Sequence, residues 1–177
     1  KCGQIYKKGY ITNHKFDEEI DYISGDASKC YSIKTGLRKF QRTLFFVKPN
    51  IIFVMDEVKF NKTSNLVESL WHTNNKTRIK ISGDSVLFKG KKNQTSFKIL
   101  TNNQPTKKVY SKFLSHGPFL KCSFSNIGKA NTFISVFEIK NDKYSKVLNY
   151  ELQKNNNGKY IINIYDKVAN KNIQLFN

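Results

Sequence analysis

The sequence lacks the motifs of the common catalytic classes. It contains no glycine-rich phosphate loop, no GxSxG nucleophile motif and no HExxH metal-binding motif. Its three His residues, at positions 14, 72 and 116, have no neighbouring His or Cys at metal-ligand spacing. No catalytic motif is complete, so we assign no catalytic residue, no metal ligand and no cofactor to these residues.

Cysteine is scarce as well. Cys2, Cys30 and Cys122 are far apart in the sequence, and their odd number leaves at least one of them without a partner in this chain. The absence of a CxxC pair argues against a zinc site. One disulfide remains open, and buried free thiols are the simpler interpretation.

Long apolar runs are absent, and none approaches the roughly 18–20 residues that cross a bilayer. The chain opens at Lys1 without an initiator Met or a signal peptide, so we expect a fragment or a processed product. A length of 177 residues predicts one domain over positions 1–177. An aromatic content of 14% argues against disorder.

Acidic residues are few, with 13 against 31 basic ones, which gives a net charge of +18. Such an excess attracts nucleic acid, anionic lipid or acidic polysaccharide. Only three of the basic residues are Arg, and readers of bases and phosphates favour the bidentate guanidinium. An AT-rich genome explains the Lys and Asn content equally well, because it encodes many such residues and they are well tolerated on a solvated surface.

Short apolar runs separated by turn signals are abundant, and they predict strands. Leu44–Val47 and Ile51–Asp56 flank Lys48-Pro49-Asn50, which is typical of a β-hairpin. Leu44 faces one side and Phe45 the other, so we expect this hairpin to be covered on both faces. The sequence therefore predicts an all-β fold, an antiparallel β-sandwich with this hairpin in its core.

Further strands follow from the same pattern. No segment of about a dozen residues keeps an apolar stripe at helical spacing, so no long helix is expected. A strand is predicted at Lys29–Ile33. Arg78–Ile81 alternates strictly, which indicates a half-exposed strand with a basic outer face, and Lys89–Asn93 forms a solvent-exposed hairpin tip. A closing antiparallel meander is predicted from three strands, at Phe133–Ile139, Val147–Leu152 and Tyr160–Tyr165.

Four short blocks occur in an ordered series, and a weaker echo continues through 114–120 and 133–139. Their order and spacing resemble the C-terminal β-sandwich region of the heparinase II/III-like polysaccharide lyases. The blocks are Gly25–Lys29, Arg42 with Leu44–Pro49, Val54–Glu57 and Leu70–Thr73.

The resemblance implies a bacterial enzyme that cleaves uronic-acid-containing polysaccharides by β-elimination, with an N-terminal helical toroid before the sandwich. The HxH-like and His-Asn patterns of that family do not occur in this sequence. The resemblance therefore implies that the catalytic groups, and any divalent metal, lie upstream of Lys1. The isolated fragment is expected to be inactive, and an extracellular or periplasmic location suits the substrate.

Candidate substrate-binding residues are mainly basic. Surface Lys is commonly only solvated, a His facing Leu66 and Leu70 is commonly hydrogen-bonded within the fold, and a single Trp commonly belongs to the core. Asp56 is predicted to pair with Arg42 or Arg38 across the hairpin. The candidates are Arg38, Arg42, Lys80, Lys89, Lys91, Lys92, His72 and Trp71.

Three functional hypotheses remain. The leading one is a C-terminal sandwich module of a polysaccharide lyase, which supports the toroid and adds basic surface for an acidic polysaccharide. The alternative is a non-catalytic module for acidic glycan or single-stranded nucleic acid, which an exposed aromatic row would favour. The third is a purely structural sandwich. An acidic patch at Asp17–Asp21 predicts a solvated loop, with a cation site as the other interpretation.

Overall fold

The computed structural model describes residues 7–111, 117–144, 148–165 and 170–175. Two compact units are present, Lys1–Ile139 and Lys140–Asn177. The single domain over 1–177 stays a prediction. The described residues contain no helix that is both long and apolar enough to cross a membrane.

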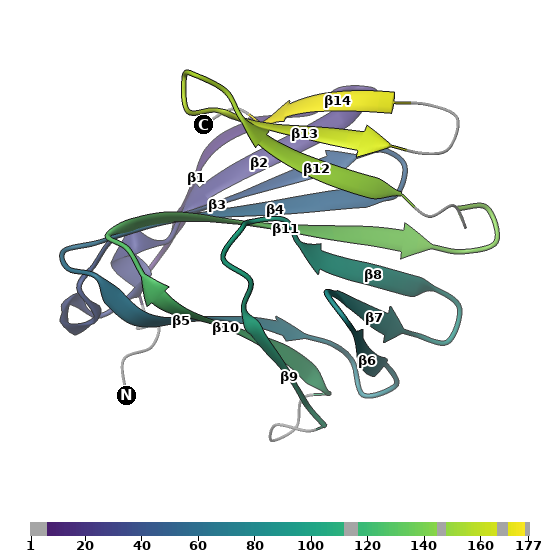
Figure 1. Ribbon diagram of the computed structural model, residues 1–177, viewed down its shortest axis with the longest axis horizontal. Helices are drawn as coiled ribbons and strands as arrows, with labels where there is room; N and C mark the ends of the chain where they lie inside the picture. The colour runs from purple at the N-terminus through teal and green to yellow at the C-terminus, as the bar shows by residue number, and fades with distance from the viewer. Residues whose placement is uncertain (1–6, 112–116, 145–147, 166–169, 176–177) are drawn as a thin grey trace. The chain divides into compact units, whose positions relative to one another are not determined.

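A large sheet of eight strands forms one layer of the first unit, in the order β1-β2-β3-β4-β11-β8-β7-β6 (Figure 1). The predicted hairpin is its centre, because β3 and β4 pair antiparallel from Val47 opposite Ile51 to Leu37 opposite Phe60. The strands are β1 (Tyr10–Lys15), β2 (Ile20–Asp26), β3 (Leu37–Val47), β4 (Ile51–Phe60), β6 (Arg78–Ser82), β7 (Ser85–Lys89), β8 (Gln94–Ile99) and β11 (Ala130–Lys140).

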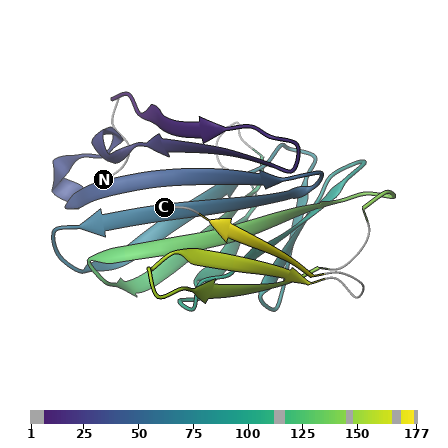
Figure 2. The ribbon, with the colours of Figure 1, turned by 90° about the horizontal axis from the view of Figure 1, so that it is seen from above.

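A short sheet of three strands in the order β5-β10-β9 forms the second layer of this unit (Figures 1 and 2). Its strands are β5 (Ser64–His72), β9 (Thr106–Tyr110) and β10 (Phe119–Ile127). Both neighbours of β10 run antiparallel to it, so Trp71, Leu120 and Val109 stand opposite one another across the three strands. The predicted all-β antiparallel sandwich is confirmed.

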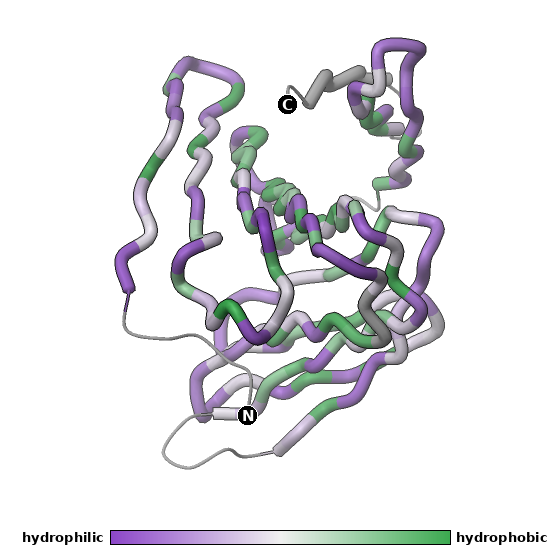
Figure 3. Tube along the Cα trace, turned by 90° about the vertical axis from the view of Figure 1, so that its left-hand side faces the viewer, coloured by the Kyte–Doolittle hydropathy of each residue, from purple (hydrophilic) through white to green (hydrophobic). Residues whose placement is uncertain are grey.

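The core lies between these two sheets, and hydropathy alternates along many of the strands (Figure 3). Phe97 and Leu120 are fully buried, and Phe124 is 1% exposed. Trp71 packs edge-on against Phe137 with ring centroids 4.9 Å apart, and against Phe97 at 5.7 Å. Aromatic rings from both sheets therefore interlock across the layers.

The two-sided burial of the central hairpin is confirmed for β4 but wrong for part of β3. Phe53, Val54 and Met55 are all at most 3% exposed, although successive residues point to opposite faces. Leu44 on β3 is 38% exposed. A three-stranded layer cannot cover every strand of an eight-stranded sheet. Some apolar residues on β3 therefore lie at the margin of the covered area.

The strand predicted at Lys29–Ile33 is wrong. Two short 3₁₀ helices, η1 (Ser28–Cys30) and η2 (Ile33–Thr35), occupy this region. The Ser32 hydroxyl accepts a hydrogen bond from the Lys34 amide, and the Thr35 hydroxyl donates to the Ser32 carbonyl at 2.7 Å. Local side-chain bonds of this kind compete with sheet pairing, and Gly36 then ends η2 in the left-handed conformation.

The predicted closing meander is wrong in its membership. β11 belongs to the large sheet and pairs with β4 from Ala130 to Glu138. The second unit instead forms its own antiparallel sheet, β12-β13-β14, and its third strand was not predicted. Val147, the expected start of one strand, lies outside the described residues. The strands are β12 (Asn149–Lys154), β13 (Tyr160–Tyr165) and β14 (Asn170–Leu175).

Truncation of Phe97 tests the importance of the core between the sheets. We expect Phe97→Ala to lower the free energy of unfolding by about 3–5 kcal/mol, because it removes a buried ring and leaves a cavity. Urea unfolding followed by circular dichroism measures this loss. Ile33→Ala is the control, since Ile33 is 87% exposed. A loss below about 1 kcal/mol for Phe97→Ala would contradict the packing described here.

Candidate functional site

A shallow basic cleft lies at the β6–β7 edge of the large sheet. Its volume is about 290 Å³, and its lining holds four basic side chains and no acidic one. Arg78 on β6 stands opposite Lys89 on β7, so the two side chains share one face of the sheet. The lining residues are Lys76, Arg78, Lys89, Gly90 and Lys91.

Two tight turns hold the remaining cations of this basic cleft. In the turn before β6, Asn74 Oδ1 accepts hydrogen bonds from the Lys76 amide at 2.9 Å and the Thr77 hydroxyl at 3.0 Å. At the β7–β8 tip, the Gly90 amide donates to the Asn93 carbonyl at 3.0 Å. These hydrogen bonds therefore fix the turns from which Lys76 and Lys91 project. Like charges held together repel each other until an anion lies among them.

The structure brings some of the predicted lysines together. Lys89 and Lys91 both line the cleft. Lys80 lies two residues beyond Arg78 on β6 and so shares its face, while Lys92 is exposed at the hairpin tip outside the lining. Sequence reasoning missed Lys76 and did not select Arg78. The strict alternation of β6 contained the signal for Arg78, but a turn lysine such as Lys76 carries none.

Arg42 points toward Trp71 of the short sheet and does not line the cleft, and its side chain is 41% exposed. Its Nε and Nη2 atoms donate to the two carboxylate oxygens of Asp56 at 2.6 and 2.7 Å, which confirms the predicted pair. The guanidinium also lies 5.2 Å from the Trp71 ring centroid and 5.7 Å from that of Phe40. Burial opposes the charge of Arg42, but the hydrogen bonds and charge of Asp56 outweigh it, so its pKa is raised.

Arg38 also lies apart from the cleft. It is exposed on β3, and its Nε donates to the Asn61 side chain.

Trp71 and His72 are neighbours that face opposite ways. Trp71 packs into the core against Phe97, and its indole N–H is buried without a hydrogen-bond partner among the described residues. His72 is exposed on the other face of β5, where its ring stacks on Phe119 at 5.0 Å. Because they point to opposite faces of the sheet, the two side chains cannot contact one ligand together.

The cysteine and remaining histidine candidates add no site. Cys30 and Cys122 are free thiols, and burial raises the pKa of the Cys122 thiol to about 11. A thiol with so high a pKa is unreactive at neutral pH. Cys2 and His116 lie outside the described residues.

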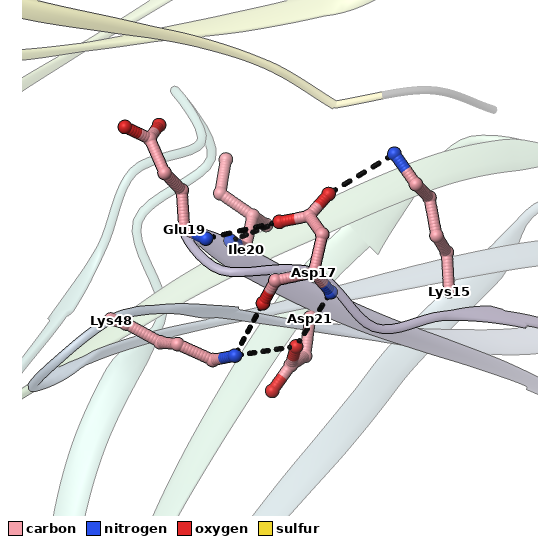
Figure 4. A network of polar contacts seen from close by, with 6 residues as sticks. All are labelled: Lys15, Asp17, Glu19, Ile20, Asp21 and Lys48. Atoms are coloured by element: carbon pink, nitrogen blue, oxygen red, sulfur yellow. Dashed lines mark hydrogen bonds and ion pairs between the residues drawn. The ribbon is translucent and has the colours of Figure 1, made fainter.

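The acidic patch is a turn tied together by lysines (Figure 4). Asp17 Oδ1 accepts from the Ile20 amide at 2.8 Å, and its second oxygen lies 3.0 Å from Lys15 Nζ. Lys48 Nζ reaches from the β3–β4 turn to Asp21 at 2.9 Å and to the Asp17 carbonyl. Within the described part of the chain, no group of three or more His, Cys, Asp or Glu is arranged to hold a metal.

Comparison with known proteins identifies the fold. The sequence matches no family model and no curated protein. A heparan sulfate lyase HepC mutant from Pedobacter heparinus is similar in structure, with a TM-score of 0.69 and 13% identity over 97% of this chain. Two heparinase III structures have TM-scores of 0.67 and 0.65, with identities of 13% and 9%, and cover 95% and 94% of this chain.

The fold of this chain is thus a β-sandwich of the kind found in heparinase structures, and the expected resemblance is confirmed at that level. The chain spans only 27–28% of the length of those proteins.

Titration of Asp17 tests the turn at the acidic patch. Hydrogen bonding from the Ile20 amide, then from Lys15, lowers the pKa of Asp17 from 3.8 to about 2. Because the folded pKa is the lower one, this carboxylate stabilises the fold above about pH 4, and the contribution disappears as pH falls toward about 2.

Carbon-detected NMR of the Asp17 carboxyl group should give a midpoint near that lowered value. We expect Lys15→Gln to raise the midpoint, whereas Lys62→Gln, on another turn, leaves it unchanged. A midpoint at the ordinary 3.8 in the unmutated protein would show that the turn is not formed in solution.

Proposed function

We propose that this chain is the β-sandwich module of a larger polysaccharide lyase and that its basic cleft binds an acidic, uronic-acid-containing polysaccharide. One observation carries the proposal: four cations and no acid line one cleft, on a fold that heparinase structures share. The structural match supports the class of protein. The cleft supports the role of this module within it.

The chemistry of the cleft suits a flexible polyanion. Lysine ammonium groups are compact point charges on flexible stems, so they follow carboxylates and sulfates whose spacing varies along a polymer. The single guanidinium in the lining, from Arg78, adds a planar fork that matches one carboxylate or sulfate. Binding would release counterions from the polymer, so the affinity should fall steeply with salt.

The remaining parts of the proposal concern the larger protein. In β-elimination a base removes the proton next to a uronate carboxylate while the charge of that carboxylate is neutralised. We assign neither the base nor a metal ligand to this chain. Its proposed partners are an acidic polysaccharide and an N-terminal helical toroid of the same bacterial protein, acting outside the cell or in the periplasm.

A non-catalytic binding module is the second candidate. The net charge of +18 favours it, because a basic surface binds acidic glycan or single-stranded nucleic acid without any catalytic domain. A protein whose remaining length holds no helical toroid would favour this candidate over the lyase.

Neutralising the cleft tests the proposed binding site. We expect Lys89→Gln/Lys91→Gln to weaken heparan sulfate binding about tenfold and to lower the slope of log affinity against log salt by about two, because each lysine displaces about one counterion. Isothermal titration calorimetry at several salt concentrations measures both. Lys34→Gln/Lys62→Gln is the matched control, since both lysines are exposed and belong to other elements. Equal losses in the two double variants would exclude the cleft.

An activity assay of this chain tests whether the catalytic residues lie outside it. We expect the purified 177-residue protein to produce no unsaturated uronate from heparan sulfate, because its sequence contains no complete catalytic motif. The ultraviolet absorbance of the eliminated product is the measurement, with an active heparinase as the positive control. Product formation by this chain would place the catalytic residues within it.

A further inference from the structure

Three aromatic rings form a continuous row across the short sheet. His72 on β5 stands opposite Phe119 on β10, which stands opposite Tyr110 on β9. The His72 and Phe119 ring centroids are 5.0 Å apart, and those of Phe119 and Tyr110 are 4.7 Å apart with an interplanar angle of 5°. We call His72, Phe119 and Tyr110 the aromatic row.

The aromatic row lies on the outer face of the sandwich. Trp71 and Leu120 precede and follow row residues and point into the core, so the row itself points outward. Leu70, on the same face of β5, is 48% exposed. Phe119 is buried, whereas His72 is exposed and Tyr110 half-buried. The row therefore lies on the face of the short sheet that points away from the large sheet, with His72 accessible at one end.

Two lysines give this surface a positive charge. Lys108 and Lys121 stand opposite each other two positions along the strands from Tyr110 and Phe119, so they share the face of the row. Their Nζ atoms lie 5.3 and 5.4 Å from the Tyr110 ring centroid. Lys121 also contacts Glu68 at 2.8 Å. Hydrogen bonding with Glu68, and then with Tyr110, raises the pKa of Lys121, so this group stays charged at neutral pH. Lys108 is exposed.

Short backbone contacts connect the aromatic row to the basic cleft. Thr73, which follows His72, donates from its amide and its hydroxyl to the Pro118 carbonyl at 3.1 and 2.6 Å. A Cβ at Gly117 would lie only 2.4 Å from the backbone of Asn74, so glycine permits this close approach. The Asn74 turn then presents Lys76 to the cleft. Residues 73–75, which these contacts hold in place, thus separate His72 from Lys76, the first cleft lysine in the sequence.

We propose that the aromatic row with Lys108 and Lys121 is a second sugar-binding surface, which takes a uronic-acid residue of the polysaccharide that occupies the basic cleft. The apolar C–H groups of the sugar ring pack along the row, and its carboxylate lies beside the two ammonium groups. This inference rests on the proposed function for the class of ligand, and on the row itself for the position of the site.

The geometry favours a sugar over a nucleic-acid base. Bases bind by stacking on open ring faces. Here Phe119 is enclosed by its two neighbours, and the face of Tyr110 that lies against Phe119 is covered as well. The stacked faces inside the row are therefore closed to a base, whereas the exposed His72 ring and the two ammonium groups over Tyr110 suit a hydroxylated, carboxylated ligand.

The test uses the whole 177-residue chain and an unsulfated octasaccharide of alternating glucuronic acid and N-acetylglucosamine. Proton–carbon NMR of the aromatic side chains should show His72 and Tyr110 signals moving as the octasaccharide is added. We expect Tyr110→Ala to weaken binding about fivefold to tenfold, in the range of an aromatic interface anchor, and Lys108→Gln to weaken it about threefold. Tyr10→Ala on β1 is the matched control, because Tyr10 is 56% exposed.

The outcomes separate this site from the proposed function. If the octasaccharide binds equally to Tyr110→Ala, to Lys108→Gln and to the unmutated protein, the second surface is wrong while binding at the cleft stands. If neither the octasaccharide nor heparan sulfate binds the unmutated protein, both are wrong. If the row variants weaken binding of oligothymidylate but not of the octasaccharide, the class of ligand is wrong. Lys108→Gln changes an exposed position, so it tests the surface even if Tyr110→Ala does not fold.

Discussion

The packing of Trp71 between the two sheets is the constraint on which the functional surfaces depend. Its ring contacts Phe97 and Phe137 of the large sheet, and the Arg42 guanidinium lies over it. Side chains alternate along a strand, so the inward position of Trp71 forces His72 outward. A slip of β5 by one residue would bury the histidine and remove the aromatic row. The packing of Trp71 in the core therefore determines which residues of β5 lie on the surface.

Arg42 illustrates how the same contact limits the choice of ligand-binding residues. The guanidinium belongs to a side chain that is 41% exposed and lies over the Trp71 ring, and two hydrogen bonds to Asp56 pair its charge. That pairing occupies the fork that would otherwise bind a carboxylate of the substrate. The lysines and the arginine at the β6–β7 edge do remain available for a ligand, and the turn at Asn74 and the tip at Gly90 hold them there.

Local patterns predicted much of the fold. The two apolar runs around Pro49 indicated the central hairpin, and alternation in Arg78–Ile81 indicated a strand with a basic face, because both signals are contained in a few consecutive residues. Lys89 and Lys91 were predicted together for the same reason. The 3₁₀ turns near Ser32 were missed, since hydrogen bonds of single hydroxyl groups decided them.

Long-range pairing could not be predicted in the same way. His72, Tyr110 and Phe119 come from three strands, and only the register of the short sheet places them in one row. The assignment of β11 to the large sheet likewise depends on its pairing with β4, which is distant in sequence. The fold of this chain is similar to that of the heparinase structures at only 9–13% identity, so local sequence patterns are a poor guide to such pairings.

A crystal structure of this chain with an acidic octasaccharide would locate the sugar on the protein. We expect a sugar chain that begins among Arg78, Lys89 and Lys91 and continues past the Asn74 turn to the aromatic row. Carboxylates of the sugar should lie within hydrogen-bond distance of the cleft cations. A sugar chain bound on the β1–β2 hairpin instead, with the cleft empty, would show that neither the cleft nor the aromatic row is the binding site.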